Sequence, residues 1–122
     1  MRKIKAIIKR PDWKPYSTWI SDSLENLQTL VGGYIETVTI CPQTLEENGE
    51  CTLPGLVAIC NEEGRLMNME HCCTVDGVDY VGPVIFVGVR GDEFDDIPVD
   101  YNVFRIMFPE LWGGDDLSAS QF

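Results

Sequence analysis

Long apolar runs and histidine are scarce in this chain of 122 residues, and so are basic side chains beyond the N-terminus. No run of about 18 consecutive apolar residues is present, so we expect no transmembrane helix. His71 is the only histidine. No two cysteines have the C-x₂₋₄-C spacing that structural zinc sites use. We therefore expect no membrane association, no metal site and no other cofactor.

The N-terminus does not read as a signal peptide. The segment MRKIKAIIKRP is basic, but lysines interrupt its apolar stretch and no small-residue cleavage site follows. We expect a cytoplasmic location. Five cysteines are present, an odd number, and Cys72 and Cys73 are adjacent. Without an oxidising compartment they are expected to be free thiols.

Charge is divided unevenly along the chain. Residues 1–14 hold six basic residues and one acidic residue, for a net charge of +5. Residues 15–122 hold three basic and 19 acidic residues, for a net charge of −16. Such a surface repels phosphate backbones, so direct nucleic-acid binding is not expected. The acid excess either serves solubility or forms a face that docks on a basic, nucleic-acid-handling protein.

The hydrophobic pattern predicts four strands. Residues 3–9 alternate between apolar and mainly basic side chains, as in an edge strand. Residues 34–40 are β-branched and aromatic. Residues 56–60 and 83–89 are continuous apolar runs, typical of interior strands. Residues 43–55 are polar and form either a hairpin tip or a mobile loop, with a turn at Asn48-Gly49.

Two helices are predicted. The first begins at Asp22, which has Glu25 three residues later, and ends at Gly32 and Gly33. The second begins at Asp95 or Asp96, has Pro98 in its first turn and is stopped by Pro109. Its apolar face comprises Val99, Val103, Ile106 and Met107.

These elements together indicate an α+β domain over residues 1–112, followed by a frayed tail over residues 113–122. We expect a small mixed sheet of four or five strands with both helices on one face, in the order β-α-β-β-β-α. Residues 11–21 and 65–80 are expected to be irregular connections. Nothing in the pattern chooses between a monomer and a homodimer.

Three segments, LENLQTLVGGYIETV, LVAICNEEG and VGPVIFVG, resemble a family of small proteins of unknown function. The resemblance covers roughly residues 1–108, and VGGYIE and CNEEG are its most specific parts. It implies a protein of phages, plasmids and other mobile elements of Firmicutes and related gut bacteria, acting in the bacterial cytoplasm. It implies no reaction, because the family offers no catalytic residues to transfer.

Three local patterns can be interpreted either as chemical sites or as ordinary structural elements. Cys72 or Cys73 could be a nucleophile activated by His71, but no surrounding motif supports a thiol hydrolase, and a surface loop is favoured. Gly32 and Gly33 follow a helix, whereas phosphate loops precede one, so they indicate a turn. Residues 61–64, NEEG, lack the alternating oxygen ligands of a calcium loop and indicate a hairpin turn. We therefore expect a protein without enzymatic activity.

Two functions remain. The first is a mobile-element protein that blocks or modulates a host nucleic-acid-handling protein, in the manner of an anti-CRISPR or antirestriction protein, by mimicking nucleic acid. Its partner-binding residues would be acidic and aromatic: Asp92, Glu93, Asp95, Asp96, Asp115, Asp116, Trp13, Trp19 and Trp112. The alternative is a small-ligand or nucleotide-binding module between the sheet and residues 65–80, with Arg65 and Arg90 holding an anion.

Overall fold

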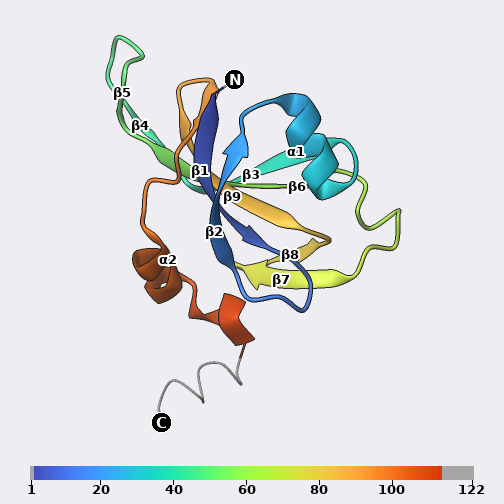
Figure 1. Ribbon diagram of the computed structural model, residues 1–122. Coiled ribbons are helices and arrows are strands. Elements are labelled where there is room, and N and C mark those ends of the chain that lie inside the picture. The colour runs from blue at the N-terminus through green and yellow to red at the C-terminus, as the bar shows by residue number, and fades with distance from the viewer. Residues whose placement is uncertain (1, 114–122) are drawn as a thin grey trace.

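A six-stranded antiparallel sheet forms the centre of the computed structural model, which describes residues 2–113 (Figure 1). Five strands follow the order β2-β1-β9-β6-β3, and β10 lies beside β9. Their bounds are β1 (Lys3–Lys9), β2 (Tyr16–Ser21), β3 (Ile35–Cys41), β6 (Gly55–Asn61), β9 (Val84–Arg90) and β10 (Glu93–Asp95). All pairings are antiparallel, so the expected mixed sheet was wrong.

Two short hairpins and three helical segments complete the fold. The hairpins are β4 (Thr44–Leu45) with β5 (Cys51–Leu53), and β7 (His71–Val75) with β8 (Val78–Val81). The helices are α1 (Leu24–Val31), α2 (Tyr101–Met107) and the 3₁₀ helix η1 (Pro109–Trp112). Among residues 2–113, no helix is long and apolar enough to cross a membrane. The α+β class is confirmed, although strands dominate.

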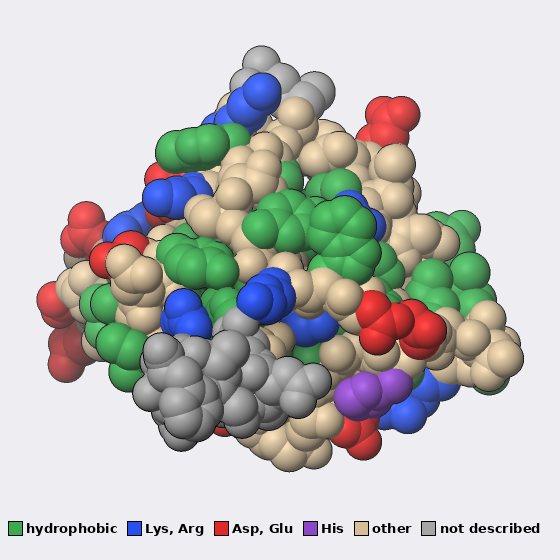
Figure 2. All heavy atoms as spheres, turned by 60° about the horizontal axis from the view of Figure 1, so that its bottom comes forward, with side chains coloured by type: hydrophobic (Ala, Val, Ile, Leu, Met, Phe, Trp, Pro, Cys, Tyr) green, Lys and Arg blue, Asp and Glu red, His purple; other side chains and the backbone are tan. Residues whose placement is uncertain are grey.

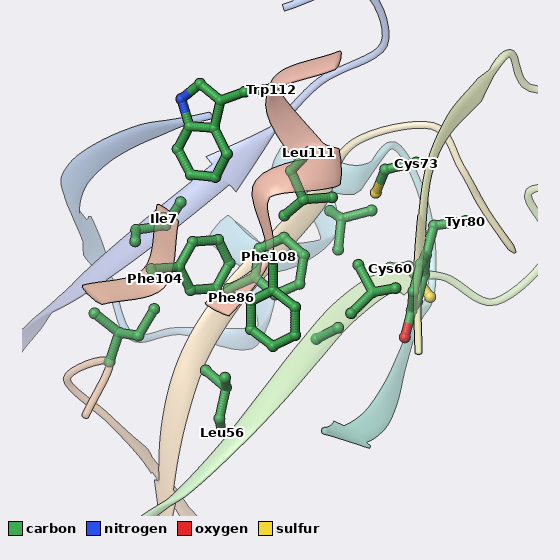
Figure 3. Close-up of a cluster of buried hydrophobic side chains, with 14 residues drawn as sticks. Ile7, Leu56, Cys60, Cys73, Tyr80, Phe86, Phe104, Phe108, Leu111 and Trp112 are labelled. Atoms are coloured by element: carbon green, nitrogen blue, oxygen red, sulfur yellow. The ribbon is translucent and has the colours of Figure 1, made fainter. Parts of the chain in front are cut away.

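The sheet is covered on both faces, not on one as the sequence predicted. Leu27 and Val31 of α1 pack with one set of sheet residues, which includes Ile59 and Ile85. Phe104 of α2 packs with the opposite set, which includes Phe86 (Figure 3). The reason is visible in β6 and in most of β9, whose side chains are buried on both sides. A strand that is apolar on both sides needs a cover on each face.

Two stretches expected to be irregular are strands. Residues 16–21 form the edge strand β2, in which Ile20 is buried while Trp19 is exposed. β2 pairs with β1 along its length, so β1 is an interior strand and not an edge strand. The β7–β8 hairpin, residues 71–81, takes up most of the stretch 65–80. Both cases are short alternating strands, and prolines, tryptophans and cysteines obscure their pattern.

The first helix is close to its prediction. Ser23, not Asp22, is the N-cap, and its Oγ accepts a hydrogen bond from the Asn26 amide at 3.2 Å. The helix ends at Gly32, whose φ of 82° lies in the left-handed region. The glycine stop is therefore confirmed, and the start is displaced by one residue.

The second helix begins later than predicted. Asp100 is its N-cap, and its carboxylate accepts a hydrogen bond from the Val103 amide at 2.8 Å. Asp95 is instead the last residue of β10, which pairs with β9. The later start rotates the buried face, so Phe104 is fully buried while Ile106 is 79% exposed.

Gly88 allows β10 to lie against β9. A Cβ atom at this position would lie 2.2 Å from the Asp96 carbonyl oxygen, which is main-chain and cannot rotate away. We expect Gly88→Ala to lower the free energy of unfolding by about 1–3 kcal/mol, as other overpacking substitutions do. Urea unfolding measures this, with the exposed strand residue Thr39→Ala as the control. Equal stability of both variants would contradict the placement of β10.

Candidate acidic interface

The β4–β5 hairpin projects from the body of the protein at one end of the sheet (Figure 1). Its tip carries Glu46, Glu47 and Glu50, all exposed. The tip is closed by main-chain hydrogen bonds from the Glu46 amide to the Glu50 carbonyl (2.7 Å) and from the Gly49 amide to the Glu46 carbonyl (2.9 Å). The Asn48 side chain also accepts from the Glu50 amide at 3.0 Å. Gly49 has a φ of 87°. The predicted turn at Asn48-Gly49 is confirmed, and it holds three carboxylates away from the core.

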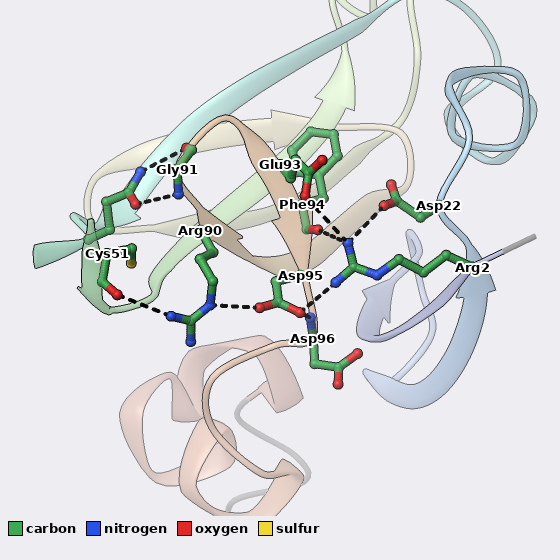
Figure 4. A network of polar contacts seen from close by, with 10 residues as sticks. Arg2, Asp22, Cys51, Arg90, Gly91, Glu93, Phe94, Asp95 and Asp96 are labelled. Atoms are coloured by element: carbon green, nitrogen blue, oxygen red, sulfur yellow. Dashed lines mark hydrogen bonds and ion pairs between the residues drawn. The ribbon is translucent and has the colours of Figure 1, made fainter. Parts of the chain in front are cut away.

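The turn between β9 and β10 lies beside the base of this hairpin. The Gln43 side chain donates to the Gly91 carbonyl at 3.0 Å and accepts from the Gly91 amide at 2.7 Å (Figure 4). Arg90 donates to the Cys51 carbonyl at 3.3 Å. These bonds hold the exposed side chains of Asp92 and Glu93 at the same end of the molecule as the hairpin. We call the set Glu46, Glu47, Glu50, Asp92 and Glu93 the acidic end.

Asp95, which the sequence assigned to the interface, is used within the fold. Its two carboxylate oxygens accept from Arg2 at 2.8 Å and from Arg90 at 3.1 Å (Figure 4). The Asp96 amide donates to it as well, and this bond is the main reason that the pKa of Asp95 lies below its ordinary value; the two arginines lower the pKa further. Asp95, in β10, is therefore bonded to β9 and to the residue that precedes β1, and it offers little free charge to a partner.

Asp96 is also engaged. Its carboxylate accepts from the Lys5 amide at 2.9 Å, and the neighbouring Ile97 amide donates to the Lys5 carbonyl at 2.9 Å. These bonds fix the chain after β10 along β1. Asp115 and Asp116, the remaining acids of the predicted set, lie outside the described residues 2–113.

We expect Asp95→Asn to lower the free energy of unfolding at pH 7 by about 1 kcal/mol, because it removes the charge shared by two partly exposed arginines. The folded-state pKa of Asp95 is lowered, so its stabilisation is present above the unfolded-state pKa, near 3.9, and is lost as the pH falls through the folded-state value. Urea unfolding at pH 7 and pH 3 measures both effects. The difference between wild type and variant should shrink at pH 3, and Asp92→Asn is the control.

The three predicted aromatic anchors divide into two groups. Trp13 and Trp19 are 61% and 58% exposed, so they remain available to a partner. Trp112 is buried and cannot be an exposed anchor. Its ring packs edge-on against Tyr101 at 5.6 Å and lies under the Arg105 guanidinium at 5.7 Å. This packing fixes η1 against α2.

Arg65 and Arg90 do not form a common anion site. Arg65 borders a hollow of about 470 Å³ between the sheet and the β7–β8 hairpin, where the sequence placed the ligand. Arg90 does not line it and is paired with Asp95. Four carboxylates also border this hollow, which disfavours a phosphate ligand: Glu36, Glu62, Glu63 and Asp79.

A second hollow, of about 710 Å³, contains His71, Cys72 and Cys73; we call it the thiol hollow. His71 Nε2 lies 3.7 Å from the Asp79 carboxylate on β8. Among residues 2–113, no hydrogen bond joins His71 to either thiol, so the Cys-His nucleophile has no assembled base. In the same range, no group of three or more His, Cys, Asp or Glu side chains is placed to hold a metal ion.

Figure 2 shows the molecule with the lower part of Figure 1 brought forward. The single histidine, in purple, lies near carboxylates, while lysine and arginine side chains are interspersed with hydrophobic ones over the same view. Charge of both signs is therefore present on this face.

A family model described as a domain of unknown function (DUF3846) matches residues 4–108. The chain belongs to the DUF3846 family. Searches of curated proteins and of solved structures found no match. The family match confirms that this chain belongs to a family of unknown function.

The sequence interpretation overlooked the glutamates of the hairpin tip. Three glutamates flank the Asn48-Gly49 turn, and this pattern could have identified an exposed acidic hairpin. The densest acidic run, residues 92–96, was predicted to bind the partner, but two of its members, Asp95 and Asp96, form hydrogen bonds within the fold.

Proposed function

We propose that this protein is a non-catalytic accessory protein of a phage or other mobile element that binds and inhibits, or modulates, a host nucleic-acid-handling protein. It would be of the anti-CRISPR or antirestriction type, and its acidic end would occupy a basic groove that otherwise holds nucleic acid. The observation that carries the proposal is the projecting hairpin, whose three exposed glutamates lie beside Asp92 and Glu93.

The placement of charge supports this role. A basic groove that binds nucleic acid attracts carboxylates by the same electrostatic complementarity. Within residues 2–113, the side chains of Glu46, Glu47 and Glu50 make no hydrogen bond or ion pair that would neutralise them. They are thus free to meet a partner's lysines and arginines.

Apolar side chains next to the glutamates supply the rest of a protein interface. Leu45 and Leu53 flank the tip and are 51% and 59% exposed. Buried apolar contacts provide much of the affinity of protein complexes, whereas charges steer association and select the partner. An acidic tip with two leucines at its base can therefore bind a protein more tightly than charge alone would allow.

Affinity capture from a lysate of the native host tests the proposal. The immobilised protein should retain a nucleic-acid-handling protein at low salt and release most of it at about 0.5 M salt, because exposed charges are then screened. Retention of no such protein at low salt would count strongly against the proposal. Retention that is indifferent to salt would contradict the electrostatic mechanism.

A small-ligand or nucleotide-binding module is the second candidate. The hollow beside Arg65 lies at the predicted location, which favours it, but its surplus of carboxylates does not suit a nucleotide. A panel of nucleotides tested by thermal unfolding separates the two functions. An unchanged melting temperature with every nucleotide would eliminate this candidate.

A further inference from the structure

The hollow beside Arg65 contains a buried polar group that neither proposed function uses. Tyr80 of β8 lines this hollow and is only 3% exposed. Its ring belongs to the core cluster and reaches toward Cys60 of β6 (Figure 3). Within residues 2–113, however, the Tyr80 hydroxyl makes no hydrogen bond. Buried polar groups in folded proteins are nearly always hydrogen-bonded, so this exception needs an explanation.

The Tyr80 hydroxyl is open to the hollow. Among the described residues, no buried side-chain oxygen or nitrogen is both sealed from solvent and without a hydrogen bond. Because the hydroxyl has no hydrogen bond, its oxygen must keep contact with open space, and the hollow is the space that Tyr80 lines. A phenolic oxygen can accept hydrogen bonds as well as donate one. The hydroxyl is therefore available to a ligand that enters the hollow.

The walls of the hollow are held in place by bonds within the protein. In the turn after β6, the Gly64 amide donates to the Asn61 carbonyl at 3.3 Å, and the Asn61 side chain accepts from the Glu63 amide at 2.7 Å. Arg65 joins this turn to β8, because its guanidinium donates to the Asp79 carbonyl at 3.0 Å. The hollow is therefore formed before any ligand binds, as small-molecule sites usually are.

The charge around the hollow is negative. Glu36, Glu62 and Glu63 are exposed, and within residues 2–113 their carboxylates make no hydrogen bond or ion pair. The Asp79 carboxylate is already bonded within the β7–β8 hairpin. Four acidic residues and one basic residue, Arg65, are among the described lining residues, so the lining carries a net charge of −3. This charge attracts cations and repels anions.

Much of the remaining lining is apolar. It includes Val38 of β3, Cys60 of β6, and Val78 and Val81 of β8. A ligand that suits the hollow therefore has three features: a positive charge for the glutamates, a hydrocarbon part for the valines, and an N–H group that donates to the Tyr80 oxygen. A hydrated metal ion has no hydrocarbon part, and a phosphate has the wrong charge. An alkylammonium ion has all three features.

We infer that this hollow is a binding site for a linear alkyl diamine or polyamine. One ammonium group donates a hydrogen bond to the Tyr80 hydroxyl, the alkyl chain lies against the valines, and a second ammonium group lies among the free glutamates. The site is separate from the acidic end. Amine binding therefore neither requires nor excludes the proposed interaction with a host protein, and either one can fail without the other.

Putrescine, a linear alkyl diamine, is the probe for the test. Titration calorimetry of the native full chain at pH 7 and low salt should show saturable binding of one putrescine per chain. Magnesium ion has the same charge but neither a hydrocarbon part nor an N–H group, so we expect it to bind about tenfold more weakly or less. Absence of saturable putrescine binding would overturn the inference, and so would equal affinities for putrescine and magnesium.

Tyr80→Phe tests the contact with the hydroxyl. This substitution keeps the ring in the core and removes only the oxygen. We expect the putrescine affinity to fall about tenfold, because a hydrogen bond from a charged donor is lost. An unchanged affinity would overturn the role of Tyr80.

A triple variant tests the charges without touching the core. Glu36→Gln/Glu62→Gln/Glu63→Gln removes the free carboxylates of the hollow, and we expect putrescine to bind about tenfold more weakly or less. The control, Glu46→Gln/Glu47→Gln/Glu50→Gln, removes the same charge from the hairpin tip and should bind putrescine within about twofold of the wild type. Equal weakening in both triple variants would show that putrescine responds to net charge alone, and this would overturn the site.

Discussion

Replacing Glu46, Glu47 and Glu50 together by glutamine is expected to weaken binding to the captured host protein about tenfold or more. If each carboxylate contributes about 0.5 kcal/mol at physiological salt, the loss is about 1.5 kcal/mol, which is about tenfold in Kd. The hairpin itself should persist, because main-chain bonds and Asn48 hold its tip. Titration calorimetry at two salt concentrations measures Kd and its salt dependence.

The control removes three charges elsewhere on the surface. Glu62, Glu63 and Asp76 are exposed and lie in the turn after β6 and the turn between β7 and β8. Asp76 has a φ of 51°, which asparagine tolerates, so Glu62→Gln/Glu63→Gln/Asp76→Asn matches the first variant in charge. Equal weakening by both triple variants would show that net charge alone matters and would contradict an interface at the acidic end.

Phe104→Ala is expected to lower the free energy of unfolding by about 3–5 kcal/mol, the usual cost of truncating a buried phenylalanine. Phe104 is fully buried, and its ring lies 5.0 Å from Phe86 and 5.1 Å from Phe108 (Figure 3). It is the residue through which α2 packs on the sheet. Urea unfolding followed by tryptophan fluorescence measures the loss, because Trp112 lies 6.2 Å from the same ring.

Ile106→Ala is the matched control for that substitution. The sequence interpretation placed Ile106 on the buried face of this helix, but its side chain is 79% exposed. We therefore expect a change within about 0.5 kcal/mol, as for other surface substitutions. A large loss of unfolding free energy in Ile106→Ala and a small loss in Phe104→Ala would contradict this packing and support the buried face that the sequence predicted.

The parts of the fold that the sequence predicted well are those determined by local chemistry. Continuous apolar residues made the interior strands β6 and β9 recognisable. Gly32-Gly33 made the end of α1 recognisable, and Asn48-Gly49 did the same for the hairpin turn. The antiparallel order of strands and the cover on each face depend on contacts between distant residues. The start of α2 was misplaced for this reason, since the pairing of β10 with β9 holds Asp95 in a strand.

The candidate interface could also be predicted only where local sequence determines it. Exposed acids next to a turn can be identified from the sequence, and Asp92 and Glu93 remain exposed as expected. The Asp95 carboxylate, in contrast, is bonded to Arg2, which lies 93 positions away in the sequence, and this pairing cannot be seen from the local pattern. The register shift between His71 and Cys73 in the pairing of β7 with β8 is likewise not revealed by one sequence.

A competition measurement tests the central claim most directly. A labelled DNA duplex is bound to the captured host protein, and the DUF3846 protein is then added at increasing concentration. If the acidic end occupies the nucleic-acid groove, the duplex should be displaced completely, and the Glu46, Glu47 and Glu50 variant should require about tenfold more protein. A complex that holds the duplex and this protein at the same time would contradict the account.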